Sequence, residues 1–306
     1  MLRSVILAAA RSPRVERLVE TAPVSRDVVR RFVAGTATAD ALRVSRELAA
    51  AGLGVSLDHL GEDTQTPEQA EHTRDEYVHL LGELSAAGLT PAAEVSVKLS
   101  ALGLQFDEKL ALRYARDICV AAADAGTTVT VDMEDHGTTD ATLEILSQLR
   151  IDHPGTGAVL QAYLRRTEGD CRELAGAGSR VRLCKGAYAE PETVAYQSAL
   201  DIDKSYVRCL NILMSGEGYP MLATHDPRLV AIGEDRAKWF DRSSETFEFQ
   251  MLYGIRPAEQ NRLVEAGYTM RVYVPYGTEW YGYLMRRLAE KPQNLGFFVR
   301  SLVSKK

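Results

Sequence analysis

Residues 54–65 read GVSLDHLGEDTQ, an apolar run of strand character that ends in polar residues and is followed by no G-x-G-x-x-G motif. A doubly wound open sheet, the structural alternative, is expected to carry that motif after its first strand. Similar runs, bounded by Gly or Pro, recur along the chain, and the segments between them have helical periodicity. We therefore predict an α/β protein built as a (β/α)8 TIM-like barrel, distorted from the regular form. The predicted strands are residues 54–59, 94–100, 128–133, 157–163, 180–185, 220–225, 247–251 and 270–274.

The length of 306 residues suits one barrel preceded by helices. We predict an N-terminal helical segment at residues 1–50 and the barrel at residues 51–306. The chain has 45% hydrophobic residues, as a soluble globular protein does, and its net charge of −6 argues against a nucleic-acid surface. Its four cysteines show neither C-x-x-C nor metal-ligand spacing, which predicts a cytoplasmic protein with reduced thiols and no metal site.

Polar residues stand at the ends of the predicted strands. In a barrel of this type the chemistry lies at the carboxyl ends of the strands, so these residues are candidates for function. Each of them taken alone is more often part of the scaffold than a catalytic group. They are Asp58, His59, Lys98, Asp132, Gln161, Arg182, Lys185, Thr224, His225, Gln250 and Tyr273.

Residues 182–188 read RLCKGAY and place two cations before a Gly-Ala step at the end of a predicted strand. The glycine lets the backbone approach a ligand closely. Lys185 could supply a point charge to a phosphate, and Arg182 could donate to a ring system. The motif therefore suits a planar, anionic redox cofactor, and by itself it suits a sugar phosphate equally well. We interpret Cys184 as a small residue of the barrel wall.

Residues 270–290 read MRVYVPYGTEWYGYLMRRLAE, a strand-like run followed by a helical pattern. Tyr283, Arg286, Arg287 and Glu290 lie three or four residues apart and can share one helix face. Paired guanidinium groups bind carboxylates through two hydrogen bonds, and a glutamate one turn later would orient one of them. A solvated helix with an ordinary surface ion pair is the alternative for these residues alone.

Motifs at nearly every predicted strand end from the second strand onward resemble those of the FAD-dependent proline dehydrogenase family. They run in collinear order over about residues 90–295, which chance rarely produces. The length suggests the compact, monofunctional bacterial type, since no segment of aldehyde-dehydrogenase size follows. The motifs are EVSVKLSALG, VDMED, VLQAYLRRT, RLCKGAYAEP, LATHD, FEFQMLYGIR and RVYVPYGTEWYGYLMRRLAEKPQN.

The resemblance implies a flavoenzyme that oxidises L-proline to 1-pyrroline-5-carboxylate by hydride transfer to FAD and passes the electrons to a membrane quinone. This is the first step of proline catabolism to glutamate and implies a functional link to 1-pyrroline-5-carboxylate dehydrogenase. Arg286 and Arg287 would hold the proline carboxylate, and Glu290 would pair with an arginine and border the substrate ring. Lys98 and Asp132 would form an ion pair beside substrate and flavin. The residues that would wall the proline ring are Tyr188, Leu252, Tyr273 and Tyr283.

The same resemblance implies a set of catalytic and cofactor-binding residues. Lys98, Asp132 and Tyr273 would be the catalytic group, with Lys98 also contacting substrate. Arg182 would contact the region of the flavin's hydride-accepting nitrogen. The remaining residues that would help to hold FAD are Asp132, Met133, Gln161, Lys185, Gly186, Ala187, Tyr188, Thr224, His225, Gln250 and Glu290.

Two alternatives stay open at the level of sequence. A Schiff-base aldolase would use Lys98 or Lys185 at a strand end, and a non-catalytic barrel would bind an amino acid without transforming it. No apolar run is long enough to cross a membrane, so electron delivery to quinone would need peripheral contact with the inner face of the membrane. The N-terminal helices and residues 294–306, NLGFFVRSLVSKK, are the candidates for that contact, with a helix packed on the barrel as the alternative for the latter.

Overall fold

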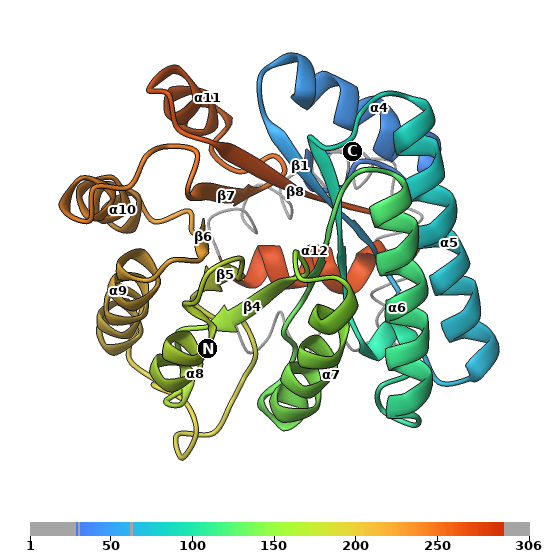
Figure 1. Ribbon diagram of the computed structural model, residues 1–306, viewed down its shortest axis with the longest axis horizontal. Helices are drawn as coiled ribbons and strands as arrows, with labels where there is room; N and C mark the ends of the chain where they lie inside the picture. The colour runs from blue at the N-terminus through green and yellow to red at the C-terminus, as the bar shows by residue number, and fades with distance from the viewer. Residues whose placement is uncertain (1–28, 30, 62–63, 291–306) are drawn as a thin grey trace, which may run out of the picture.

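The computed structural model describes residues 29, 31–61 and 64–290, and in this part the chain forms a closed barrel of parallel strands (Figure 1). Each strand pairs with the next one along the chain, and β8 pairs with β1 from Gly54 opposite Arg271 to His59 opposite Tyr276. Closure leaves no strand of the barrel with an open edge. The strands are β1 Gly54–His59, β2 Ala93–Val97, β3 Val129–Val131, β4 Gly157–Gln161, β5 Arg180–Cys184, β6 Tyr219–Ala223, β7 Glu248–Leu252 and β8 Met270–Tyr276.

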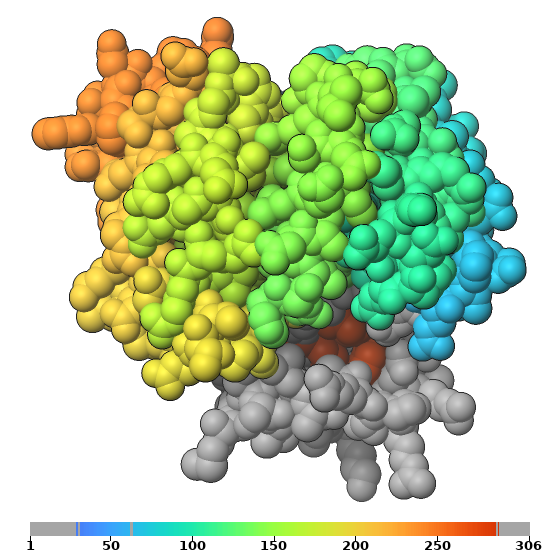
Figure 2. Space-filling view, turned by 60° about the horizontal axis from the view of Figure 1, so that its bottom comes forward, coloured from blue at the N-terminus to red at the C-terminus, as the bar shows by residue number. Residues whose placement is uncertain are grey.

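Helices alternate with the strands and form an outer ring, whose surfaces lie side by side in chain order in Figure 2. The last helix, α12, crosses the middle of the ring in Figure 1 instead of lying in its outer layer. The helices are α4 Thr38–Ala50, α5 Pro67–Ala86, α6 Glu108–Asp124, α7 Thr139–Asp152, α8 Thr167–Leu174, α9 Ala199–Ser215, α10 Pro227–Trp239, α11 Pro257–Glu265 and α12 Trp280–Glu290, with the short 3-10 turns η1 Ser100–Leu102 and η2 His136–Thr138.

Local capping signals set where the long helices begin. Thr66 accepts a hydrogen bond from the N–H of Gln69 at 3.4 Å, and the Gln69 side chain accepts one from the N–H of Thr66 at 3.2 Å. This reciprocal pair is a capping box, and Pro67 occupies the first helical position, where a missing N–H costs nothing. Asp107 caps α6 in a similar way by accepting from the N–H groups of Lys109 and Leu110, both at 3.0 Å.

The predicted (β/α)8 barrel is confirmed, but several predicted strands are too long at their carboxyl ends. Lys98, Asp132 and Ala162 lie just beyond β2, β3 and β4, and Ser100 already begins η1. Single hydrogen bonds between neighbouring strands still form at these ends, since the N–H groups of Asp132 and Ala162 donate to the carbonyls of Val97 and Cys184 at 2.9 and 2.8 Å, but the chain then leaves the sheet for the loops. The residue pattern does not mark the position at which the chain leaves the sheet, so the predicted strands run too far.

The interior of the barrel is polar. Arg182 on β5 donates to Ser56 on β1 at 3.0 Å, and these strands are not neighbours, so the bond crosses the interior. Because side chains alternate along a strand, every second residue belongs to this interior set. The apolar residues between them, such as Val55, Val95 and Leu183, are buried in the hydrophobic core. The polar residues of this interior set include Ser56, Asp58, Glu94, Ser96, Thr130, Arg180, Arg182, Glu248, Gln250, Arg271 and Tyr273.

The chain before β1 contacts the barrel. The N–H of Ala34 donates to the carbonyl of Pro275 at 2.9 Å, and the N–H of Gly277 donates to the carbonyl of Gly35 at 3.0 Å. The remainder of the predicted N-terminal segment, residues 1–28 and 30, lies outside the described residues. Within the described ranges, no helix has both the length and the apolar character that spanning a bilayer requires.

Candidate active site

Four of the predicted site residues meet inside the barrel, toward the carboxyl ends of the strands. Lys98 and Asp132 directly follow β2 and β3, whereas Arg182 and Tyr273 lie in the middle of β5 and β8 and not at their ends. The hydroxyl of Tyr273 donates to Asp132 at 2.8 Å, and Nη1 of Arg182 donates to the other Asp132 oxygen, also at 2.8 Å. Nζ of Lys98 lies 3.4 Å from the Tyr273 hydroxyl and 3.8 Å from Asp132. The predicted Lys98–Asp132 ion pair is therefore present, at the long end of the range for such pairs.

A closer partner of Lys98 is Asp58, a predicted strand-end residue for which the sequence indicates no role. Nζ of Lys98 lies 2.6 Å from Oδ2 of Asp58, and Asp58 on β1 is only 1% exposed. The signal in the sequence was the polar pair Asp58-His59 at the end of an apolar strand. No role followed from it because the motif resemblance began only after β1.

Arg182 is held by four hydrogen bonds and is 4% exposed. Its Nε donates to Gln250 at 2.6 Å, and its Nη1 donates to Ser96 at 2.8 Å in addition to Asp132. The remaining bond is the one to Ser56 on β1. The guanidinium carbon also lies 5.3 Å from the centre of the Tyr273 ring, a cation–π distance. These contacts fix both the position and the plane of the guanidinium.

The charges of this cluster balance. Asp58 and Asp132 are opposed by Lys98 and Arg182, so the buried group carries no net formal charge when all four are ionised. Burial raises the pKa of Tyr273 well above its usual value, and the carboxylates of Asp132 and Asp58 raise it further. Tyr273 therefore keeps its proton at neutral pH and acts as a hydrogen-bond donor to Asp132.

The loop after β5 places Lys185 between two carboxylates. Nζ of Lys185 lies 2.6 Å from Asp203 on α9 and 3.1 Å from Asp226, which caps α10. Gly186 has φ 102°, and a Cβ at this position would lie 2.2 Å from the Tyr163 ring. The glycine is therefore required by the packing of Tyr163 beneath the loop as well as by its backbone conformation.

The other residues implied by the resemblance lie at neighbouring strand ends. Nε2 of Gln161, the last residue of β4, donates to the carbonyl of Glu134 at 2.6 Å. Thr224 follows β6 and accepts from the N–H of Asp226 at 3.2 Å. Nε2 of Gln250 donates to Glu248 at 2.5 Å. This bond orients the Gln250 side-chain amide so that its Oε1 accepts from Arg182. Met133 is buried, while Ala187, Tyr188, His225 and Leu252 are half-buried.

Helix α12 presents part of the predicted carboxylate-binding face. Tyr283 is 6% exposed, and the guanidinium carbon of Arg287 lies 5.2 Å from the centre of its ring. The prediction that these two residues share a face is therefore confirmed. The side chains of Arg286 and Glu290 lie outside the described part of the structure, as does the tail at residues 294–306.

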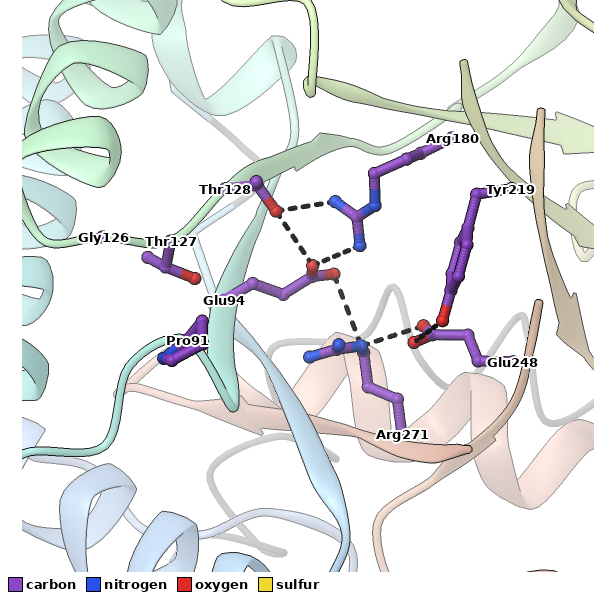
Figure 3. A pocket seen from close by; sticks show the side chains of 9 residues that line it. All are labelled: Pro91, Glu94, Gly126, Thr127, Thr128, Arg180, Tyr219, Glu248 and Arg271. Carbon is purple, nitrogen blue, oxygen red and sulfur yellow. Dashed lines mark hydrogen bonds and ion pairs between the residues drawn. The ribbon is translucent and has the colours of Figure 1, made fainter. Parts of the chain in front are cut away.

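A cavity of about 290 Å³ lies at the opposite, amino-terminal end of the barrel (Figure 3). Its charged side chains point toward one another and form ion pairs between Glu94 and Arg180 at 2.6 Å and between Glu248 and Arg271 at 2.8 Å. Burial by itself raises the pKa of Glu94, but Arg180, Arg271 and Arg182 together lower it to about 2. In (β/α)8 barrels the residues at the amino-terminal end serve stability, and the active site lies at the carboxyl-terminal end. We therefore place the candidate site at the carboxyl ends of the strands.

Comparison with known proteins gives the family of the chain. The sequence matches the family profile described as Proline dehydrogenase over residues 41–300. It is 35% identical to proline dehydrogenase 1 of Bacillus subtilis, with 100% of both chains covered. It is 38% identical to the proline dehydrogenase of Deinococcus radiodurans, covering 99% of this chain and 98% of that one.

A solved structure gives the same result for the fold. Proline utilization A from Bdellovibrio bacteriovorus, inactivated by N-propargylglycine, superimposes with a TM-score of 0.81 at 26% sequence identity. The match covers 92% of this chain and 34% of that longer one. The bifunctional protein PutA of Rhizobium meliloti is 27% identical over 331 residues, which is 27% of its length. A family profile over nearly the whole barrel, relatives of equal length and a matching fold lead to one conclusion: this chain is a member of the proline dehydrogenase family.

Proposed function

We propose that this protein oxidises L-proline to 1-pyrroline-5-carboxylate with FAD as its cofactor. The observation that carries the proposal is the cluster of Lys98, Asp132, Arg182 and Tyr273 toward the carboxyl ends of the strands, on a chain of this family. The family is one of oxidoreductases that act on proline, and it implies a flavin.

The chemistry of the donor set fits FAD. The flavin would supply the electron chemistry when bound. Arg182 is fixed in position by four hydrogen bonds and by an ion pair with Glu94 at 3.8 Å, which suits a guanidinium that contacts the ring system. Gly186 adopts a positive φ that brings the backbone close to the strand ends, and Lys185 contributes a cation there. The other residues proposed to hold FAD are Asp132, Met133, Gln161, Ala187, Tyr188, Thr224, His225, Gln250 and Glu290.

The substrate contacts follow from the three chemical parts of proline. Its carboxylate calls for cations, and we assign Arg286, Arg287 and Lys98 to it. Its apolar ring calls for aromatic and aliphatic walls, and its amine calls for a carboxylate nearby. We assign the walls to Tyr188, Leu252, Tyr273 and Tyr283, and the carboxylate near the ring to Glu290.

The Schiff-base alternative has little support. A nucleophilic lysine must be a neutral amine, and it is usually activated by an apolar pocket or a neighbouring cation. Lys98 lies 2.6 Å from Asp58, and Lys185 lies 2.6 Å from Asp203, so both amines face carboxylates that favour the charged ammonium. A non-catalytic barrel is also a poor fit, since the full-length relatives are named as dehydrogenases.

Three further assignments complete the proposal. Electrons would pass to a quinone at the membrane through peripheral contact, and the product would be taken up by a 1-pyrroline-5-carboxylate dehydrogenase. The second link is supported by the bifunctional relative, whose chain is more than three times as long. Residues 51–306 would form the catalytic barrel, with the segment before them as a helical addition. Quinone reduction would be tested with vesicles that contain ubiquinone or menaquinone.

The proposed reaction is tested with purified protein. We expect a yellow sample whose flavin absorbance bleaches when L-proline is added without oxygen, and a cyclic imine product that o-aminobenzaldehyde traps. L-alanine serves as an acyclic control that should bleach nothing. A protein that holds FAD but is not bleached by proline would refute the substrate, and a colourless protein that borohydride inactivates with a carbonyl compound would favour the aldolase.

A further inference from the structure

We infer that Arg256 is a positioning residue that clamps the loop after β6 onto the loop after β7 and so holds the FAD-binding side of the site. The inference rests on the proposed function, which places His225 and Leu252 at the ligands. Arg256 itself lies in the FEFQMLYGIR motif but has no role so far. It is half-buried and stands directly before Pro257, the first residue of α11.

The backbone of Arg256 is strained. Its φ of 51° and ψ of 50° are left-handed helical values, which cost a non-glycine residue energy. The following proline restricts Arg256 further, because a residue before proline favours extended conformations. Glycine would fit the same backbone without this cost. A strained arginine where glycine would be easier indicates that its side chain is needed.

A comparison inside the chain supports this reasoning. Among the described residues, Asp241 is the other non-glycine residue with positive φ, at 52°. Asp241 follows the end of α10, where its N–H donates to the carbonyl of Lys238 at 3.3 Å, and aspartate is one of the residues that tolerate this conformation. Its backbone is therefore explained by the helix end. Arg256 begins a helix, makes no side-chain cap and has no such explanation.

The side chain of Arg256 reaches across to the neighbouring loop. Its Nη1 donates to the backbone carbonyl of His225 at 2.9 Å, and its Nη2 lies 3.6 Å from Glu259 on α11. The guanidinium of Arg256 is thus paired with a carboxylate on α11 and hydrogen-bonded to the main chain of His225. A hydrogen bond from a charged donor is among the stronger ones in proteins.

The imidazole of His225 is fixed from the other side. The N–H of Leu252, the last residue of β7, donates to Nε2 of His225 at 2.9 Å. An Nε2 that accepts a hydrogen bond carries no proton, so the neutral ring has its proton on Nδ1. His225 is therefore held by Arg256 at its carbonyl and by Leu252 at its ring. Both its place and its donor atom are set before any ligand arrives.

The loop that carries Arg256 is held firmly enough to keep the strain. Nε2 of Gln260 on α11 donates to the carbonyl of Ile255 at 2.8 Å and to that of Leu252 at 3.3 Å. Gly254 has φ 73°, and a Cβ there would lie 1.7 Å from the carbonyl oxygen of Arg31. The chain at Arg31 therefore packs directly against the loop after β7. Strain persists where the surroundings fix the conformation, as they do here.

The test uses the holoenzyme and the variants Arg256→Gly and Arg256→Asn, both of which suit the left-handed backbone and remove the guanidinium. We expect FAD to dissociate about tenfold faster from both, measured by the rise of free-flavin fluorescence after dilution. With FAD in large excess, melting temperatures should stay within about 2 °C of wild type, because relief of strain offsets the lost contacts. Asp241→Gly is the matched control. It relieves the same left-handed backbone strain, and we expect it to leave the rate of FAD release unchanged.

The outcomes distinguish a failure of the proposed function from a failure of the clamp. Wild-type protein that binds no FAD would overturn the proposed function. Wild-type protein that binds FAD, with unchanged release in both Arg256 variants, would overturn the clamp alone. A fall of more than about 5 °C in the melting temperature of both variants under saturating FAD would also overturn it, since Arg256 would then serve the fold.

Discussion

Replacement of Arg182 by lysine keeps the charge and removes the planar donor set. The guanidinium makes four hydrogen bonds, to Gln250, Ser96, Asp132 and Ser56, at 2.6–3.0 Å. A lysine ammonium has three N–H groups on one nitrogen, so at least one of these buried acceptors loses its donor. An unsatisfied buried group costs about 1–3 kcal/mol. Arg182→Lys should therefore lower the free energy of unfolding by that amount.

The same change should lower kcat/KM for proline by about ten- to a hundredfold, because a loss of about 1.4 kcal/mol in the transition state is a factor of ten. Arg182→Ala should be worse for stability, by about 3–5 kcal/mol, since Asp132 loses its closest cationic partner. The measurements are denaturant unfolding and proline-dependent dye reduction. Arg166→Lys is the control, an arginine that binds Asp170 at 3.0 Å on α8 outside the barrel. If Arg182→Lys turns over proline as wild type does, or if Arg166→Lys loses as much activity, the role of Arg182 is refuted.

Three further predictions concern residues of α12 and the buried Glu94 at the amino-terminal end of the barrel. Arg286→Met or Arg287→Met should raise KM for proline about tenfold and leave FAD content unchanged, from loss of a charge-assisted hydrogen bond; steady-state kinetics would contradict this if KM stays constant in both. Tyr283→Ser should change the ratio of kcat/KM for 4-hydroxyproline to that for proline about tenfold in favour of 4-hydroxyproline; a lower melting temperature with an unchanged ratio would make Tyr283 a packing residue only. The pKa of Glu94 is lowered from 4.5 to about 2, so its carboxylate stabilises the fold by about 3 kcal/mol above pH 4.5, and this stabilisation is lost as the pH falls to 2. The free energy of unfolding of Glu94→Gln, measured between pH 2 and 4.5, should therefore depend less on pH than that of wild type.

The sequence predicted the barrel well because its signals are local. Apolar runs, Gly and Pro boundaries and helix caps such as Thr66 and Asp107 depend only on nearby residues. The polar strand ends were also readable, and Lys98, Asp132, Arg182 and Tyr273 do meet. What placed them together is the fold: parallel strands in a closed barrel bring all their carboxyl ends to one face.

Apart from the Lys98–Asp132 pair, which the family resemblance implied, the partnerships between remote residues could not be predicted from the sequence. Asp58 pairs with Lys98 across 40 positions of the chain, and Lys185 pairs with Asp203 and Asp226. Charge pairing leaves no periodic signal, and each strand end offers several polar candidates. The left-handed backbone of Arg256 was hidden for the same reason, since nothing in its neighbours shows that the chain must bend there. Such features depend on which loops the barrel brings side by side.

Arg182 joins the two halves of the barrel interior. Above it, Asp132 links it to Tyr273 and Lys98. Below it, Gln250 carries its bond on to Glu248, which pairs with Arg271 in the network of Figure 3. The acidic and basic residues balance in each half, so each half is neutral without the other. A change to the lower network would therefore reach Arg182 through the Gln250 amide, which accepts its hydrogen bond at 2.6 Å, and through Glu94, which lies 3.8 Å from its Nη2. The position of Arg182, rather than the net charge around it, is what the lower half of the barrel supplies to the chemistry.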